Sequence, residues 1–325
     1  MKKIMLSFVW IFLALVCALG LAIRFGGPVQ PAPLPSVNDP FKSIDYSGLP
    51  PIQRFAARDG AELGFREYPA LSAVRGSIVL IHGSSASSNS MHAMAKAFSQ
   101  AGYTAYALDM RGHGVSGSKG QIAHIGQLED DLADFMEAVK PVTPATLLGF
   151  SSGGGFALRF AGDSRQKLFD NYLLLAPYLH YRAPTMRPQS GGWVNVGMPR
   201  MIALTVLNRL GITAFNGLPV IAFALDAKAQ KFLTPNYSFA LMQNFQPRDD
   251  YRAGMRAARQ PMEVLVGAQD ELFQADRFAE AFRDAGRPLR VTLVADTGHI
   301  ALTLKQEAIQ AALAALTRLD APSGR

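Results

Sequence analysis

A serine flanked by small residues is the first candidate for chemistry in this chain. The apolar run 145–148 is followed by Gly149-Phe150-Ser151-Ser152-Gly153 and then by a glycine-rich segment that is compatible with a helix. Glycines two positions before and after a serine allow close backbone approach where a strand turns sharply into a helix. Such a turn places the hydroxyl above a sheet, at the N-terminus of the helix. The pattern indicates a nucleophile at Ser151; a glycine- and serine-rich loop after a buried strand is the alternative.

A serine nucleophile needs a base to accept its proton. Where a serine nucleophile lies in such a strand-to-helix turn of a parallel sheet, the catalytic residues follow along the chain in the order serine, acid, histidine. Five of the six histidines precede the point near residue 261 where the strand pattern resumes, and only His299 follows it. His299 lies in a glycine-containing turn, directly after the predicted strand 290–294. We therefore expect His299 to be the base, with a surface-loop histidine as the alternative.

The base needs an acid that orients it, and Asp270 directly follows the predicted strand 262–266. Its loop would face His299. Glu271 is adjacent to it, and Asp296 is three residues before His299, where it more simply braces a turn. Asp270 is the favoured acid, with Glu271 and Asp296 as alternatives.

An acyl-transfer site also needs two backbone N–H groups aimed at the developing negative charge. One would belong to Ser152, directly after the nucleophile. The other should come from the loop after the predicted strand 78–81, which begins His82-Gly83-Ser84-Ser85. Ser84 is our candidate for this second donor. We expect His82 to brace its loop.

These residues need a scaffold, and the hydrophobic pattern predicts one. A hairpin around Asp59-Gly60 is followed by short apolar strands that alternate with helical patterns. Such alternation predicts a mostly parallel sheet covered by helices on both faces. The expected strands are 77–81, 103–108, 145–150, 172–175, 262–266 and 290–294, and the expected helices include 91–101, 128–140, 274–285 and 300–319.

The alternation is interrupted at residues 178–260, which are punctuated by Pro and Gly and then become apolar. We expect helices at 201–210 and 218–225, and a helical cap over the carboxyl edge of the sheet, where ligands bind in open α/β sheets. One interpretation of the Met and aromatic side chains of this segment is that they line an acyl-chain groove. For most of them we favour the alternative, that they form the core of the cap itself.

The N-terminus predicts a membrane segment. Residues 4–23 carry no charge and follow Lys2 and Lys3, and about 20 apolar residues are enough to cross a bilayer. We favour a retained single-pass anchor with the catalytic domain on the non-cytoplasmic side, because positive residues stay on the cytoplasmic side. The alternative is a signal peptide, whose cleavage would give a secreted or periplasmic protein. The following Pro-rich stretch predicts a stiff, extended spacer.

The composition excludes several classes of protein. The chain has 325 residues, 49% of them hydrophobic, and a net charge of +7. No basic stripe is interleaved with aromatic residues, so we expect no nucleic-acid partner. The single cysteine, Cys17, excludes an intrachain disulfide and a Cys-based metal site, and we expect neither a metal nor a cofactor. We divide the chain into an anchor or signal peptide (1–24), a linker (25–51), a core (52–177 and 261–321) and a cap (178–260).

Several motifs together resemble the α/β-hydrolase superfamily, and most closely its monoacylglycerol lipase, lysophospholipase and serine aminopeptidase-like branch. The similarity runs from about residue 53 to 319, interrupted by the cap, which matches no member known to us. The motifs are His82-Gly83, Asp109-Met110-Arg111-Gly112-His113-Gly114-Val115-Ser116-Gly117, Gly149 to Gly153, Gly267 to Asp270 and Gly298-His299.

The resemblance implies an α/β-hydrolase fold with Ser151, Asp270 and His299 as catalytic triad and with Ser84 and Ser152 as oxyanion donors. It also implies that Asp109, Arg111 and His113 shape a loop. Two features depart from the family: Ser152 replaces a frequent methionine, and the loop 84–90 is rich in serine where glycine and acidic residues are usual.

Three functions are compatible with these features. The leading hypothesis is a membrane-anchored serine hydrolase that cleaves a carboxylic ester of a lipid-like or small alcohol. The second is an amide or peptide hydrolase that uses the same triad. The third is a catalytically silent binding protein on this fold, against which the complete Ser-Asp-His set argues.

Overall fold

The structure is a computed structural model and describes residues 2–35, 45–188 and 192–321. Its centre is an eight-stranded sheet with the order β1-β2-β4-β3-β5-β6-β10-β11. Strand β2 pairs antiparallel with β1 and β4, and all other pairs are parallel. The strands are β1 Gln53–Ala56, β2 Glu62–Tyr68, β3 Gly76–Ile81, β4 Tyr103–Leu108, β5 Ala145–Phe150, β6 Asn171–Leu175, β10 Met262–Gly267 and β11 Arg290–Val294.

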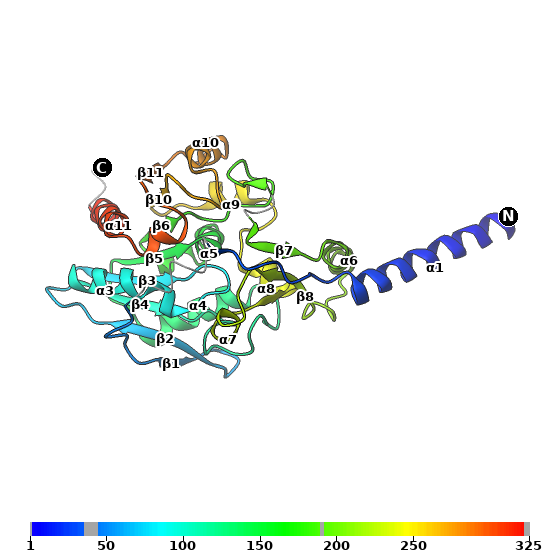
Figure 1. The fold of residues 1–325 in the computed structure, drawn as a ribbon, viewed down its shortest axis with the longest axis horizontal. Coiled ribbons are helices and arrows are strands. Elements are labelled where there is room, and N and C mark those ends of the chain that lie inside the picture. Colours follow the sequence, from blue (N-terminus) through cyan, green and yellow to red (C-terminus); the bar gives the residue numbers. More distant parts are fainter. Residues whose placement is uncertain (1, 36–44, 189–191, 322–325) are drawn as a thin grey trace.

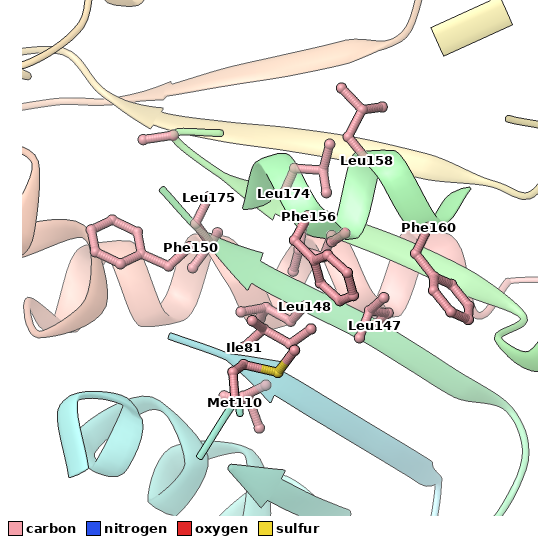
Figure 2. Close-up of a cluster of buried hydrophobic side chains, with 14 of the residues drawn as sticks. Ile81, Met110, Leu147, Leu148, Phe150, Phe156, Leu158, Phe160, Leu174 and Leu175 are labelled. Carbon is pink, nitrogen blue, oxygen red and sulfur yellow. The ribbon is translucent and has the colours of Figure 1, made fainter. Parts of the chain in front are cut away.

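The central strands are apolar because both faces of the sheet are covered. Every residue of β3, β5, β6 and β10 is buried. Helix α5 lies on one side of β5 and helix α11 on the other (Figure 2), and Phe156 and Phe160 of α5 point into the layer between helix and sheet. The α-helices of this part are α3 His92–Gln100, α4 Gln127–Val139, α5 Ser152–Ala161, α10 Phe278–Asp284 and α11 Gln306–Leu319.

The sequence prediction of a mostly parallel sheet with helices on both faces is confirmed, and so is the antiparallel hairpin formed by β1 and β2. The last expected helix, 300–319, is interrupted. It consists of a 3-10 turn, η6 Ile300–Thr303, and of α11, because Lys305 between them has an extended backbone. The turn η6 begins directly after His299.

The insertion between β6 and β10 contains a sheet of its own in addition to helices. Three antiparallel strands have the order β7-β8-β9. The prediction of a helix at 218–225 is wrong, because β8 occupies this segment and pairs with β7 on one side and β9 on the other. The elements are β7 Val194–Val196, α6 Met198–Arg209, β8 Pro219–Phe223, α7 Ala229–Phe232, β9 Asn236–Ser238, α8 Phe239–Asn244 and α9 Tyr251–Ala257.

The N-terminal helix α1, Lys2–Phe25, extends away from the body of the molecule (Figure 1). Its stretch Met5–Phe25 has a mean hydropathy of 2.7 and none of it is buried, so it is long and apolar enough to cross a membrane. Its C-terminal end packs against α6. The Arg200 guanidinium donates to the carbonyl oxygens of Ile23 at 2.8 Å and Arg24 at 3.4 Å. This contact places a positive charge at the C-terminus of α1, which is the negative end of the helix dipole.

The chain that follows α1 lies along the insertion. The Val29 amide donates to Asn195 Oδ1 at 2.8 Å, and the Leu34 amide donates to the Ala224 carbonyl at 3.1 Å. Residues 26–34 belong to no helix or strand, and they are hydrogen-bonded to β7 and to the end of β8. Part of the expected spacer, residues 36–44, lies outside the described residues.

Candidate active site

Ser151 lies in the sharp turn between β5 and α5. Its backbone has φ 54° and ψ −118°, an unfavourable conformation that hydrogen bonds hold in place. The Ser151 amide donates to the Leu175 carbonyl at 2.9 Å, and the Ser151 carbonyl accepts from the amides of Gly155 and Tyr178 at 2.9 and 3.0 Å. These bonds hold the Ser151 hydroxyl at the end of the strand and the start of the helix.

Glycine is required on both sides of this turn. A Cβ at position 149 would lie 2.2 Å from the carbonyl oxygen of Gly153. A Cβ at position 153 would lie 2.3 Å from the carbonyl oxygen of His82. Both distances are shorter than any real Cβ contact, so the strand and the helix can approach this closely only when both residues are glycines.

The structure brings Ser151, His299 and Asp270 into one chain of hydrogen bonds. His299 Nε2 lies 3.0 Å from Ser151 Oγ, and His299 Nδ1 lies 2.7 Å from Asp270 Oδ2. The exposed fractions are 7% for Ser151 and 1% for His299 and Asp270. This arrangement allows the hydroxyl to donate to Nε2 while Nδ1–H donates to the carboxylate, the polarity that serine activation requires.

The Asp270 carboxylate is fixed by its own loop. Its Oδ1 accepts hydrogen bonds from the amides of Leu272 and Phe273, both at 2.8 Å, which leaves Oδ2 for His299. The imidazole of His299 is in turn flanked by the rings of Phe150 and Phe273, with centroids 4.8 and 5.1 Å away. The carboxylate and the imidazole are therefore both oriented before any substrate binds.

The two alternative acids have different contacts. Glu271 Oε2 accepts from the backbone amide of His299 at 2.8 Å and does not contact the ring nitrogens. Asp296 accepts from Gln269 Nε2 at 3.2 Å, and its φ of 49° belongs to a tight turn. Of the three carboxylates, Asp270 is the one within hydrogen-bond distance of His299 Nδ1.

The two expected oxyanion donors lie in segments that flank Ser151. Ser152 is the first residue of α5, and Ser84 follows Gly83, where an added Cβ would be 3.4 Å from Ser151 Cβ. Among the hydrogen bonds of the described residues, the amides of Ser84 and Ser152 have no acceptor. An oxyanion hole needs two such amides without an acceptor, one from each of these segments.

A cavity of about 640 Å³ opens onto Ser151 and His299. Its wall includes residues of the insertion, among them Trp193, Leu225 and Phe232. The other Met and aromatic side chains that we expected in the cap are not among the residues that line this cavity. Of this set Phe223, Phe239, Met242 and Phe245 are buried, and Met198 and Phe215 are exposed.

The ionisable side chains around this cavity are mostly basic. They are Arg66, Lys119, Lys228 and Lys231, against the carboxylates Asp109 and Asp226. Both carboxylates already accept backbone hydrogen bonds: Asp109 from Ser88 and Val115, and Asp226 from Ala229. No group of three His, Cys, Asp or Glu side chains suited to a metal ion occurs among the residues that the structure describes.

The motif from Asp109 to Gly117 lies beside the site but outside the hydrogen-bond chain of Ser151, His299 and Asp270. The Arg111 guanidinium pairs with Asp131 at 2.7 Å and with Asp59 at 3.0 Å, and these partners raise its pKa. His113 Nε2 lies 2.6 Å from the Tyr237 hydroxyl, and His82 Nδ1 contacts the Gly83 carbonyl at 2.8 Å. Burial lowers the pKa of both histidines, which favours their neutral forms.

Sequence reasoning missed the polar contacts that the insertion makes with the site. Trp193 Nε1 donates to Ser84 Oγ at 2.9 Å, and the Tyr237 hydroxyl accepts from the Ser85 amide at 2.7 Å. The only signal in the sequence is that both residues are aromatic side chains with a polar group, which is usually partnered when buried. Their partners, more than 100 positions away, could not be inferred.

Comparison with known proteins shows which family the chain is similar to. Residues 72–302, more than half of the chain, match the family described as "Serine aminopeptidase, S33". A monoacylglycerol lipase of Mycolicibacterium smegmatis is 34% identical over 119 residues. This match covers 34% of the chain and 42% of that relative, so the chain matches less than half the length of the lipase.

Solved structures with the same fold include a soluble variant of the monoglyceride lipase of Saccharomyces cerevisiae, with a TM-score of 0.65 and a sequence identity of 19%. The match covers 86% of this chain and 97% of the lipase chain. A second structure is described as a membrane phospholipase A, with a TM-score of 0.57 and a sequence identity of 18%. This match covers 98% of this chain and 99% of the phospholipase chain. At these identities the likeness shows the α/β-hydrolase fold.

Proposed function

This chain belongs to the serine aminopeptidase S33 family of the α/β-hydrolase superfamily, and from this membership and the geometry of its site we propose that it is a serine hydrolase that cleaves carboxylic esters with a lipid-like acyl group. The observation that carries the proposal is the chain of hydrogen bonds from Asp270 through His299 to Ser151, at the wall of a large cavity. The monoacylglycerol lipase relative supports it.

The proposed reaction begins when Ser151 Oγ attacks the ester carbonyl and its proton moves to His299 Nε2. Asp270 stabilises the resulting imidazolium through Nδ1–H. The carbonyl oxygen becomes an oxyanion that accepts from the amides of Ser84 and Ser152, and each such donor is typically worth about 3 kcal/mol of the barrier. His299 then returns the proton to the departing alcohol, which leaves an acyl ester on Ser151.

Hydrolysis of the acyl-enzyme repeats these steps with water. His299 Nε2 accepts a proton from the water as its oxygen attacks the acyl carbon, and the same two amides hold the second oxyanion. When the intermediate collapses, the proton passes to Ser151 Oγ. The carboxylic acid is released and the enzyme is regenerated.

The charges around the cavity favour an ester over a peptide with a free N-terminus. An aminopeptidase site must bind an α-ammonium group, which needs an available carboxylate. Asp109 accepts a backbone amide at each carboxylate oxygen and Asp226 accepts one at Oδ1, while four basic side chains share the wall, so the charge around the cavity is net positive. Cleavage of amides or peptides remains the second candidate, because the family that the chain matches is described as a serine aminopeptidase.

A fluorophosphonate probe tests the proposal on the full-length protein in detergent micelles. We expect wild type to be labelled and Ser151→Ala not to be, because the probe reacts with an activated serine. Equal labelling of both would exclude Ser151 as the nucleophile. A folded wild-type protein that is not labelled would instead support a silent binding protein.

A substrate panel then decides between the two bonds. We expect turnover of p-nitrophenyl esters to increase from acetate toward longer acyl chains, because the wall of the cavity is largely apolar. Aminoacyl p-nitroanilides are the matched amides. Faster turnover of the anilides than of the esters would favour the aminopeptidase.

We also propose that α1 is retained as a single-pass anchor, with the catalytic domain on the non-cytoplasmic side. The packing of α6 against the end of α1 supports this proposal. Met198, Ile202 and Val206 are spaced by four residues on α6 and have exposed fractions of 49%, 56% and 38%, so they form one apolar side that suits a bilayer surface. N-terminal sequencing of the membrane-bound protein tests retention, because cleavage would remove residue 1 and most of α1.

A further inference from the structure

The loop that carries Ser84 is held by the insertion. Trp193 Nε1, just before β7, donates to Ser84 Oγ at 2.9 Å. The hydroxyl of Tyr237, on β9, accepts from the amide of the next residue, Ser85, at 2.7 Å. Ser84 is thus fixed through its side chain and through the peptide group that follows it. We call residues 82–85 the oxyanion loop.

Ser85 shows why this loop needs support. Its φ of 68° lies in the left-handed region, which residues other than glycine rarely adopt. Besides the Tyr237 contact, its carbonyl accepts from the Thr234 amide at 2.8 Å and its Oγ donates to the Thr234 carbonyl at 2.7 Å. Three hydrogen bonds from the insertion therefore hold Ser85 in an unfavourable conformation.

The Tyr237 hydroxyl has a defined polarity. Because it accepts from the Ser85 amide, its own proton is directed to His113 Nε2, 2.6 Å away. The other ring nitrogen, Nδ1, lies 3.3 Å from the Arg111 carbonyl and so carries the proton of the neutral ring. Burial lowers the pKa of His113 and raises that of Tyr237, so neither gains a charge near neutral pH.

We propose that Tyr237 is a positioning residue that, with Trp193 and Thr234, holds the Ser84 amide in line for the oxyanion. The insertion then helps to position the catalytic groups, in addition to forming part of the cavity wall. This inference rests on the proposed function, since it requires Ser84 to donate to the reacting carbonyl oxygen. Removing one oxyanion donor typically lowers kcat by about 10²- to 10³-fold, and a displaced donor should have part of that effect.

The test is Tyr237→Phe in the full-length protein, which keeps the ring and removes the hydroxyl. We expect kcat for p-nitrophenyl butyrate to fall by about 10- to 100-fold while KM changes less than about twofold, because the oxyanion forms only after binding. The affinity for a trifluoromethyl ketone, which forms a tetrahedral oxyanion adduct, should fall by the same factor as kcat/KM. A general loss of structure would not produce this match.

Tyr68→Phe is the matched control. Tyr68 is also buried, and its hydroxyl lies 2.9 Å from a histidine nitrogen, Nδ1 of His92. Within the part of the chain that the structure describes, it makes no hydrogen bond to the oxyanion loop. We expect it to lower thermal stability without changing kcat or the ketone affinity. Unchanged kcat and ketone affinity in folded Tyr237→Phe would overturn the proposal.

Ser85→Ala keeps the proposal testable if Tyr237→Phe does not fold. It removes the bond to the Thr234 carbonyl and should give a smaller loss of kcat and of ketone affinity, again with little change in KM. Unchanged values in this variant would overturn the inference. Wild type is assayed first, because an inactive wild type would overturn the proposed function itself and this inference with it.

Discussion

The backbone amide of His299 donates to Oε2 of Glu271 at 2.8 Å, while the imidazole of the same residue contacts the neighbouring Asp270. Two consecutive carboxylates therefore hold two different parts of one histidine. Asp270 orients the ring, and Glu271 holds the backbone from which the ring projects. The two positions should differ sharply in their effect on catalysis.

Asp270→Asn should lower kcat by about 10⁴-fold, because an amide cannot hold the imidazole in the required tautomer or stabilise the imidazolium. Glu271→Gln keeps an oxygen that can accept from the His299 amide, so we expect a loss of no more than about 10-fold. Both are measured as kcat for p-nitrophenyl butyrate. If Glu271→Gln were as damaging as Asp270→Asn, the assignment of the acid would be wrong.

Gly153→Ala should destabilise the protein by about 1–3 kcal/mol and lower activity, because the new Cβ would lie 2.3 Å from the His82 carbonyl oxygen and the backbone would have to shift. Gly254→Ala in α9 is the control. A Cβ there has no atom within 4 Å, so it should be neutral or stabilise by up to about 1 kcal/mol. Chemical denaturation in detergent compares the two; equal effects would contradict the steric argument.

The free energy of unfolding should fall as the pH is lowered below about 6.5, in part through His113. Burial holds the pKa of this histidine well below its ordinary value, so the unfolded chain takes up a proton that the folded chain does not. The loss can reach about 1.4 kcal/mol per pH unit for one such group. Denaturation at about pH 7.5 and about pH 5.5 should show a smaller loss in His113→Gln, and an equal loss in both proteins would contradict this account.

The apolar side of α6 should contact lipid in the anchored protein. In a Cys17→Ser background, a fluorophore on Ile202→Cys should be quenched by doxyl-labelled lipids, because α6 packs against the end of α1. Leu293→Cys on β11 is the control, since Leu293 is similarly exposed, at 49% against 56% for Ile202, and lies away from α6 (Figure 1). Equal quenching at both positions, or none at 202, would contradict this orientation.

The core of the fold could be predicted because its signals are local. Buried parallel strands are short apolar runs, and the helices between them repeat with their own period. The same reasoning failed at β8, because a short apolar run fits a strand and a buried helix equally well. The partners of β8 decide between them: β7 and β9 are the edges that its backbone pairs with.

The sequence alone determined which residue types could form the site. The chain order of serine, acid and histidine left His299 as the base, and the two glycines around Ser151 marked the turn; the roles of Ser151, Asp270, His299, Ser84 and Ser152 remain predictions. Only the tertiary structure decided which carboxylate contacts the imidazole, because Asp270 and Glu271 are adjacent acidic residues and only the folded chain shows where each side chain points. Only the tertiary structure shows the hydrogen bond between Tyr237 and Ser85, which are 152 positions apart. Such a bond depends on distance in space and leaves no periodic signal in the sequence.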